Sequence, residues 1–189
     1  MEGQLDIYLG PMFSGKTSRL LQILSLYADL GYKVAYINSS LDTRGENISP
    51  HNSLYKENGK FSGITKIKAI LLKEIYVEPY DIIGVDEAQF FADVVEVVSS
   101  WVNVVRKIVT VVALDGTSEM KPFGRVMELI PVADNVEKLK AKCMKCRKEG
   151  KFIDAGFTKC LEEIKSKDGI LIGGADKFMA VCRRHYFED

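Results

Sequence analysis

Near the N-terminus stands the octapeptide Gly10-Pro11-Met12-Phe13-Ser14-Gly15-Lys16-Thr17, which has the spacing of a phosphate-binding loop. An apolar run at 5–9 precedes it, and a stretch at 15–30 follows in which leucines recur at helical steps. This order predicts a strand, a glycine-rich turn and a helix, so that backbone amides and the helix N-terminus face a phosphate. Lys16 is then expected to reach the β- and γ-phosphates of a nucleotide and the Thr17 hydroxyl to face Mg²⁺. The alternative, a glycine-rich turn that matches by chance, does not explain both flanking elements.

Beyond this loop, apolar runs alternate with stretches of helical period. Strands are expected at 33–38, 80–86 and 107–114, helices at 67–75 and 94–105, and a long polar loop over 39–63. The run at 107–114 is apolar without alternation, as in a strand that helices cover on both faces. The pattern predicts an α/β fold, a P-loop NTPase-like parallel sheet flanked by helices on both sides.

Composition and charge limit the kinds of function. The chain has 189 residues, 47% hydrophobic and 28% charged, which is typical of a globular protein and not of a disordered one. At about 150 residues per domain, this length fits one principal domain, expected at 1–140, and a small Lys- and Cys-rich subdomain at 141–189. The formal net charge is zero, so we expect neither nucleic acid nor a membrane as a partner. The first residues lack the features of a signal peptide, which predicts a cytoplasmic protein.

Two neighbouring acids end the apolar run at 81–87. Asp86 and Glu87 are expected at the carboxyl edge of the sheet, where open α/β sheets bind their ligands. Neighbours on a strand point to opposite faces, so the two acids need not share a task. In nucleotide enzymes of this kind one acid holds hydrated Mg²⁺ and another orients or deprotonates the nucleophile. The prediction is therefore Asp86 for the metal and Glu87 for the base; the alternative is a solvated strand end.

All four cysteines lie after residue 140, in an arrangement typical of metal binding. Cys143-x-x-Cys146 and Cys182-x-x-His185 are two ligand pairs separated by 35 residues. Three thiolates and one imidazole predict a tetrahedral Zn²⁺ with no open position, which is a structural ion. The alternative to a metal site is that His185 is an ordinary surface residue and Cys182 a residue of the core. Cys160 has no such partner in the sequence and is expected to be a small buried residue.

Further motifs follow in order: LDTR at 41–44, DEAQFF at 86–91, ALDGT at 113–117 with KPF at 121–123, and IGGADKF at 172–178. With these motifs, essentially the whole chain resembles the cytosolic zinc-containing thymidine kinases of cellular and poxviral type. The resemblance implies transfer of the γ-phosphoryl group of ATP, with Mg²⁺, to the 5′-hydroxyl of thymidine and also of deoxyuridine, in nucleotide salvage. It also implies a homotetramer and feedback inhibition by thymidine triphosphate.

The same resemblance implies roles for particular residues. Glu87 is expected to align the nucleoside 5′-hydroxyl and take its proton. The implied nucleotide-binding set consists of Gly10, Pro11, Met12, Phe13, Ser14, Gly15, Lys16, Thr17, Asp42, Arg44, Asp86 and Gln89. The implied thymidine-binding set consists of Met12, Phe90, Leu114, Phe123, Thr158, Gly169, Ile170, Leu171, Ile172, Gly173 and Phe178.

The last members of this set belong to a segment at about 151–178 that, by the resemblance, corresponds to the family's lasso-like loop, which zinc anchors at its base. Two residues depart from the family pattern: Ser118 stands where many relatives have an aromatic residue, and Phe178 where tyrosine is common. For the bulky aromatics, core packing is the alternative to a role in the pocket.

Two other functions compete with a kinase. In the first, a small ATPase docks its zinc ribbon on nucleic acid and Glu87 activates water; the neutral charge and the lack of a basic, aromatic-interleaved stretch argue against it. In the second, the chain is an ATP-gated binding protein without turnover, which leaves Glu87 without a role.

Overall fold

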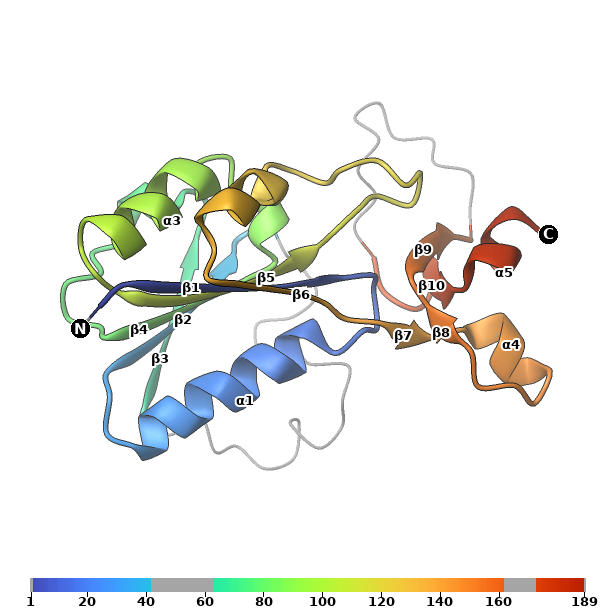
Figure 1. Cartoon of the computed structure of the whole chain (residues 1–189), viewed down its shortest axis with the longest axis horizontal. Helices are drawn as coiled ribbons and strands as arrows, with labels where there is room; N and C mark the ends of the chain where they lie inside the picture. The colour runs from blue at the N-terminus through green and yellow to red at the C-terminus, as the bar shows by residue number, and fades with distance from the viewer. Residues whose placement is uncertain (1, 42–62, 162–172, 189) are drawn as a thin grey trace.

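The computed structural model describes residues 2–41, 63–161 and 173–188, and its centre is a six-stranded sheet (Figure 1). The strands run in the order β3-β2-β4-β5-β1-β6, and every pairing is parallel. Their bounds are β1 (Gln4–Gly10), β2 (Val34–Ser39), β3 (Ile64–Ala69), β4 (Ile82–Asp86), β5 (Ile108–Leu114) and β6 (Asn135–Lys138). The predicted α/β fold with a parallel sheet is confirmed.

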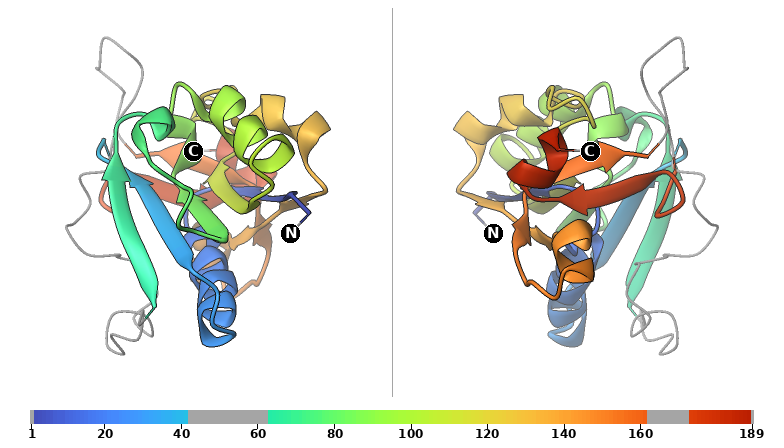
Figure 2. Two further views of the ribbon diagram at one scale, coloured as in Figure 1. Left: turned by 90° about the vertical axis from the view of Figure 1, so that its left-hand side faces the viewer. Right: turned by 90° about the vertical axis from the view of Figure 1, so that its right-hand side faces the viewer.

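Of the described helices, α1 (Lys16–Asp29) and α3 (Val94–Asn103) are the long ones, and they cover opposite faces of the sheet, as the two end-on views show (Figure 2). Helix α1 buries Leu20, Leu21 and Leu24 against one face, where leucine burial stabilises the fold by about 1.5–3 kcal/mol per side chain. Helix α3 packs against the other face through residues that include Val98 and Trp101. The other helical turns that the structure describes before residue 141 are 3₁₀: η1 (Leu72–Glu74), η2 (Ala88–Phe90) and η3 (Val126–Val132). Among the described residues, no helix combines the length and hydropathy that crossing a membrane requires.

The prediction of a helix at 67–75 is wrong. This segment contains the end of β3, which pairs with β2 along six residues, and then the single turn η1. The apolar residues at 67, 70, 71 and 75 do have helical spacing, but they straddle the end of a strand. Pairing with β2 at the edge of the sheet satisfies the backbone hydrogen bonds of β3, and this tertiary contact overrides the local period.

Strand β6 has no counterpart among the sequence predictions. All four of its residues are exposed, and they pair with β1 from Asp6 to Leu9. A short, polar edge strand shows no hydrophobic alternation, so its sequence carries no signal of the pairing.

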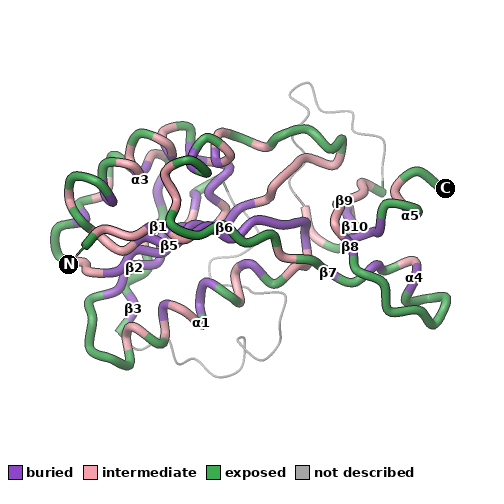
Figure 3. The backbone as a smooth tube through the Cα atoms, viewed as in Figure 1, coloured by how far each residue is buried: buried purple, intermediate pink, exposed green. Residues whose placement is uncertain are grey.

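After β6 the chain forms a small unit that we call the C-terminal ribbon, residues 141–161 and 173–188. Its strands form two antiparallel pairs, β7 (Ala141–Lys142) with β8 (Asp154–Ala155) and β9 (Phe157–Cys160) with β10 (Phe178–Val181). Two short helices complete it, α4 (Met144–Lys148) and α5 (Arg183–Phe187). Buried residues concentrate in the central strands of the main sheet, whereas much of the ribbon is exposed (Figure 3). Cys160 is half-buried on β9 and not fully buried as expected.

Candidate active site

The octapeptide forms the turn between β1 and α1, at the carboxyl edge of the sheet. Gly15 caps α1 with a φ of +82°, a left-handed conformation that glycine adopts without steric cost. At Gly10 a Cβ atom would lie 2.6 Å from the backbone oxygen of Leu139, so the chain leaving β6 can pass the loop closely only because this residue is glycine. The Lys16 ammonium is buried and donates to the backbone oxygen of Pro11 at 2.7 Å, which keeps its charge at the loop.

Asp86 lies at the end of β4 and meets the loop although β5 separates β4 from β1 in the sheet. One carboxylate oxygen accepts hydrogen bonds from the Thr17 hydroxyl at 3.3 Å and the Glu87 amide at 2.9 Å. The Tyr36 hydroxyl donates to the other oxygen at 2.7 Å. Burial, and then the negative charge of Glu87, raise the pKa of Asp86 to about 6. A hydroxyl and a carboxylate held together at the loop are hard oxygen donors, which fit Mg²⁺.

Glu87 follows in a left-handed conformation, with φ +50° and ψ +42°. This conformation costs a residue other than glycine on the order of 1–3 kcal/mol, and such strain is typical of active sites. Gln89 orients the carboxylate: its Nε2 donates to Glu87 Oε2 at 2.6 Å, while its Oε1 accepts from the amide of Leu114 at 3.1 Å. The buried Gln89 side chain thus connects Glu87 to the end of β5.

Residues of the expected thymidine-binding set make contact within two separate groups. The rings of Phe90 and Phe123 meet edge to face at 5.5 Å between centroids. The Thr158 hydroxyl accepts a hydrogen bond from the Met12 amide at 3.0 Å, although 146 residues separate the two. Phe178 is buried on β10, where it lies two residues from Ala180, the partner of Thr158 across the ribbon.

Gly173 is half-buried at the start of the second described stretch of the ribbon. Six other residues of the two expected sets lie outside the described residues: Asp42, Arg44, Gly169, Ile170, Leu171 and Ile172.

A cavity lies between the turn after β5 and the C-terminal ribbon. On the turn side its walls are residues 115–117 and Met120, and on the ribbon side residues 156–158. Lys138 also lines it and forms a 2.6 Å ion pair with Asp115. The cavity adjoins Leu114 and includes Thr158, so it continues the region where the acceptor nucleoside is expected.

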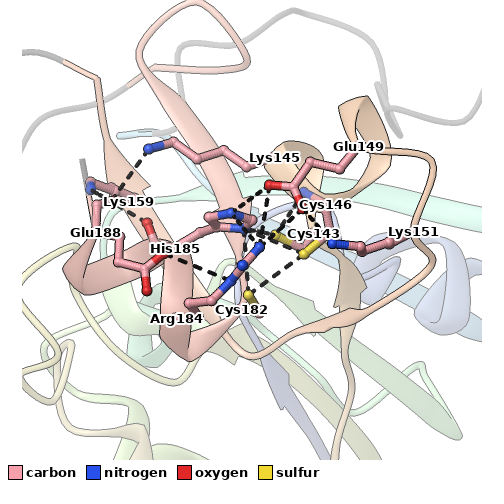
Figure 4. Close-up of polar contacts among 10 residues, drawn as sticks. All are labelled: Cys143, Lys145, Cys146, Glu149, Lys151, Lys159, Cys182, Arg184, His185 and Glu188. Atoms are coloured by element: carbon pink, nitrogen blue, oxygen red, sulfur yellow. Dashed lines mark hydrogen bonds and ion pairs between the residues drawn. The ribbon is translucent and has the colours of Figure 1, made fainter.

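The four predicted metal ligands come together in the ribbon (Figure 4). The ligand atoms of Cys143, Cys146, Cys182 and His185 all lie within 4.8 Å of one another, and all four residues are buried. His185 Nδ1 is 3.4, 3.3 and 3.6 Å from the three sulfur atoms, in the order given. Three sulfur atoms and one imidazole nitrogen in a closed, buried cluster are the donor set of a structural zinc site.

The surroundings of this cluster suit a metal ion as well. Burial opposes ionisation of the Cys143 thiol, but the amides of Cys146 and Cys182 and the ring of His185 lower its pKa to about 6. His185 Nε2, on the side away from the sulfur atoms, lies 3.1 Å from a carboxylate oxygen of Glu149. A carboxylate in this position fixes the ring orientation and the tautomer of a metal-binding histidine.

Sequence reasoning missed three residues that touch these sites: Tyr36 on Asp86, Glu149 on His185, and Tyr186, whose hydroxyl donates to the backbone oxygen of Ser118 at 2.7 Å. Each contact joins residues at least 36 positions apart in the chain. None of the three has a spacing that marks it, because the fold and not the local sequence makes the contact.

The raised pKa of Asp86 leads to a prediction about stability. The Asp86 carboxyl has an ordinary pKa of 3.8 and a pKa of about 6 in the folded protein. The stability that its protonation contributes is therefore fully present below pH 4 and is lost as the pH rises through 6. Asp86→Asn removes the buried charge. In Mg²⁺-free and nucleotide-free protein at pH 7.5, we expect this variant to unfold roughly 3 °C or more above the wild type. Thermal unfolding at pH 4.5 and 7.5 checks this, with Asp29→Asn on the exposed end of α1 as control. A gain that is as large at pH 4.5 as at pH 7.5 would contradict the assignment.

Comparison with known proteins gives one consistent family. Residues 3–186 match the family model described as thymidine kinase. Human cytosolic thymidine kinase is 38% identical over 188 residues, which cover 98% of this chain and 74% of the human protein. The thymidine kinase of Myxoma virus (strain Uriarra) is 36% identical over 186 residues, 98% of this chain and 97% of the viral one. The thymidine kinase of Vaccinia virus (strain Western Reserve) is 38% identical over 187 residues, 98% of both chains.

Proposed function

Because this chain belongs to the thymidine kinase family, we propose that it transfers the γ-phosphoryl group of ATP to the 5′-hydroxyl of thymidine, and of deoxyuridine, in nucleotide salvage. Family membership makes the chain a kinase. We propose ATP as its donor, thymidine and deoxyuridine as its acceptors, and the residue roles that follow. The observation that carries it is the contact of Thr17 with Asp86 at the phosphate loop, with Glu87 directly beside it.

The loop supplies the donor side of the reaction. Its amides, the N-terminus of α1 and the Lys16 ammonium bind the β- and γ-phosphates, since these groups provide positive charge on one side of the turn. Thr17 and Asp86 would hold Mg²⁺, which offsets the charge of the phosphates when it is bound. Asp42 and Arg44 are assigned to the phosphates as well, with Arg44 offsetting negative charge in the transition state.

Glu87 acts on the acceptor side. Its carboxylate accepts a hydrogen bond from the nucleoside 5′-hydroxyl and aligns the oxygen in line with the leaving group. A sugar hydroxyl is a weak acid, so the proton passes to Glu87 late, as the new O–P bond forms. Gln89 holds Glu87 in this orientation through the 2.6 Å hydrogen bond, and this bond supports an orienting role for Gln89 beside the nucleotide contact assigned to it.

The base of the nucleoside lies among Met12, Phe90, Leu114, Phe123 and Thr158. Phe90 and Phe123, whose rings meet edge to face, supply apolar aromatic surface, which suits a pyrimidine ring. The segment at 169–173 and Phe178 are assigned to the acceptor nucleoside as well.

The remaining features of the proposal concern the whole protein. Cys143, Cys146, Cys182 and His185 would hold a structural zinc ion, which supplies no chemistry to the reaction and keeps the ribbon folded. Residues 1–140 form the nucleotide-binding domain, and residues 141–189 form the zinc-binding subdomain. The protein works in the cytoplasm as a homotetramer, and thymidine triphosphate inhibits it as the end product of the pathway.

An assay on a panel of nucleosides tests this proposal. Purified protein is incubated with Mg-ATP and, separately, thymidine, deoxyuridine, deoxycytidine, deoxyadenosine and deoxyguanosine, and the monophosphates are separated and measured. We expect thymidine and deoxyuridine monophosphates and little of the others. If ATP binds and neither pyrimidine is phosphorylated, the proposal is wrong.

A further inference from the structure

Three contacts of described residues join the C-terminal ribbon to the catalytic part of the chain. Phe13 of the phosphate loop packs against the buried cluster of the ribbon. Thr158 on β9 accepts the hydrogen bond from the Met12 amide. The third point is the Tyr186 hydroxyl, which donates to the backbone oxygen of Ser118, 68 residues earlier in the chain. The third contact reaches the turn after β5, where Asp115 also forms its ion pair with Lys138.

Tyr186 is itself fixed firmly in the ribbon. It follows the metal-ligand candidate His185 directly in α5, and its amide donates to the backbone oxygen of Cys182 at 3.0 Å. Its ring lies 5.8 Å from that of Phe157 and 5.1 Å from that of Phe187, measured between centroids. The hydroxyl therefore projects from a side chain that is anchored directly beside the cysteine and histidine cluster.

The turn that Tyr186 contacts has a tight conformation of its own. The Thr117 amide donates to the backbone oxygen of Lys121 at 2.8 Å, and the Met120 amide to that of Thr117 at 3.1 Å. Met120 has a φ of +59°, in the left-handed region. The turn begins directly after Leu114 and ends two residues before Phe123, so its position sets the distance between two walls of the proposed base pocket.

A hydrogen bond at this place fixes the turn as a unit against the ribbon. Residues 115–117 and Met120 form one wall of the cavity and residues 156–158, which include the Phe157 under Tyr186, form the opposite wall. Neither Tyr186 nor Ser118 lines the cavity, but their hydrogen bond joins the two segments that carry these lining residues. Since Ser118 contributes its backbone oxygen to this bond, the bond does not require an aromatic residue at position 118.

We propose that Tyr186 is a positioning residue for the acceptor nucleoside: its hydroxyl ties the turn at 115–121 to the ribbon and so transmits the order of the metal cluster to the base pocket. This inference rests on the proposed function, because that proposal places the nucleoside between Leu114, Phe123 and Thr158. Tyr186 touches neither substrate, and it acts through the turn alone.

Tyr186→Phe tests the inference, because it removes the hydroxyl and keeps the ring contacts. Hydrogen exchange of the amides at 115–121 is measured first, without substrate, and we expect it to be about fivefold faster in the variant. The KM for thymidine is expected to rise by a similar factor, while kcat and the KM for ATP stay within twofold. Zinc content, measured by mass spectrometry, is expected to equal that of the wild type. Tyr76→Phe, at an exposed tyrosine after η1, is the matched control and leaves all four quantities unchanged.

The possible outcomes separate the two proposals. Unchanged exchange at 115–121 overturns the positioning role, whatever the enzyme phosphorylates, because this readout needs no nucleoside. Faster exchange with an unchanged KM for thymidine also overturns it, since the turn then does not shape the pocket. A wild type that phosphorylates no nucleoside refutes the proposed function, and Tyr186 then keeps no role in acceptor binding.

Discussion

Glu87→Gln is expected to lower kcat for thymidine phosphorylation by at least about 100-fold, the usual scale for a positioned general base. The amide has the shape of the carboxylate, and its oxygen can still accept the hydrogen bond from Gln89, so the local structure is retained. It cannot take the proton of the 5′-hydroxyl. Because the phosphate loop is untouched, the KM for ATP is expected to stay within about threefold.

Steady-state kinetics with thymidine and Mg-ATP measure this effect, with Glu74→Gln on the exposed turn η1 as the matched control. The control is expected to show wild-type kinetics. A Glu87→Gln enzyme with wild-type kcat would remove Glu87 from the mechanism, and one that loses ATP binding would show that the residue belongs to the donor site instead.

Cys146→Ser is expected to abolish zinc binding and, with it, thymidine phosphorylation. Structural zinc sites in small peptides have apparent binding free energies of about 10–16 kcal/mol, and the ribbon has only a small cluster of buried residues to hold it otherwise. Loss of the ion therefore unfolds the ribbon and removes Thr158 and Tyr186 from the catalytic part. We expect zinc to fall from about one ion per chain to below about 0.1 and kcat/KM for thymidine to fall by at least about 100-fold.

Elemental analysis and kinetics check this, and Cys160→Ser is the matched control, because Cys160 lies on β9 outside the metal cluster. The control is expected to keep its zinc. The main sheet is expected to remain folded in Cys146→Ser and to bind ATP, as a fluorescent analogue would report. Full thymidine kinase activity in zinc-free Cys146→Ser would refute the structural role of the cluster.

Features that depend on neighbours in the sequence could be predicted well. The phosphate loop, its helix and the strand before it are set by the glycines at 10 and 15 and by leucines one or two turns apart, and all of these are local. The two metal-ligand pairs, Cys143 with Cys146 and Cys182 with His185, can be predicted from their spacing alone. The fold brings their ligand atoms within 4.8 Å of one another. The strands β4 and β5 were predicted because their uninterrupted apolar runs are typical of a sheet that is covered on both faces.

Features that depend on distant partners could not be predicted. β3 and β6 are edge strands, and what holds them is hydrogen bonding to β2 and β1 and not a pattern of their own. The contact of Tyr36 with Asp86 needs β2 and β4 to be neighbours in the sheet, an order that the sequence does not state.

The aromatic residues remain the hardest to interpret from sequence. Phe90 and Phe123 form an edge-to-face pair, whereas Phe91, the neighbour of Phe90, is buried in the core. Both neighbours are equally hydrophobic, so only the course of the backbone through η2 separates a wall residue from a core residue.

The coupling of ATP consumption to thymidine is the most direct test of the central claim, that the phosphate loop and Glu87 together transfer a phosphoryl group to a sugar hydroxyl. ADP and thymidine monophosphate are measured in the same reaction, with and without thymidine. The account predicts one thymidine monophosphate for each ADP and almost no ADP without thymidine. ADP formation at the same rate in both reactions, with no monophosphate, would mean that Glu87 activates water and would contradict the account.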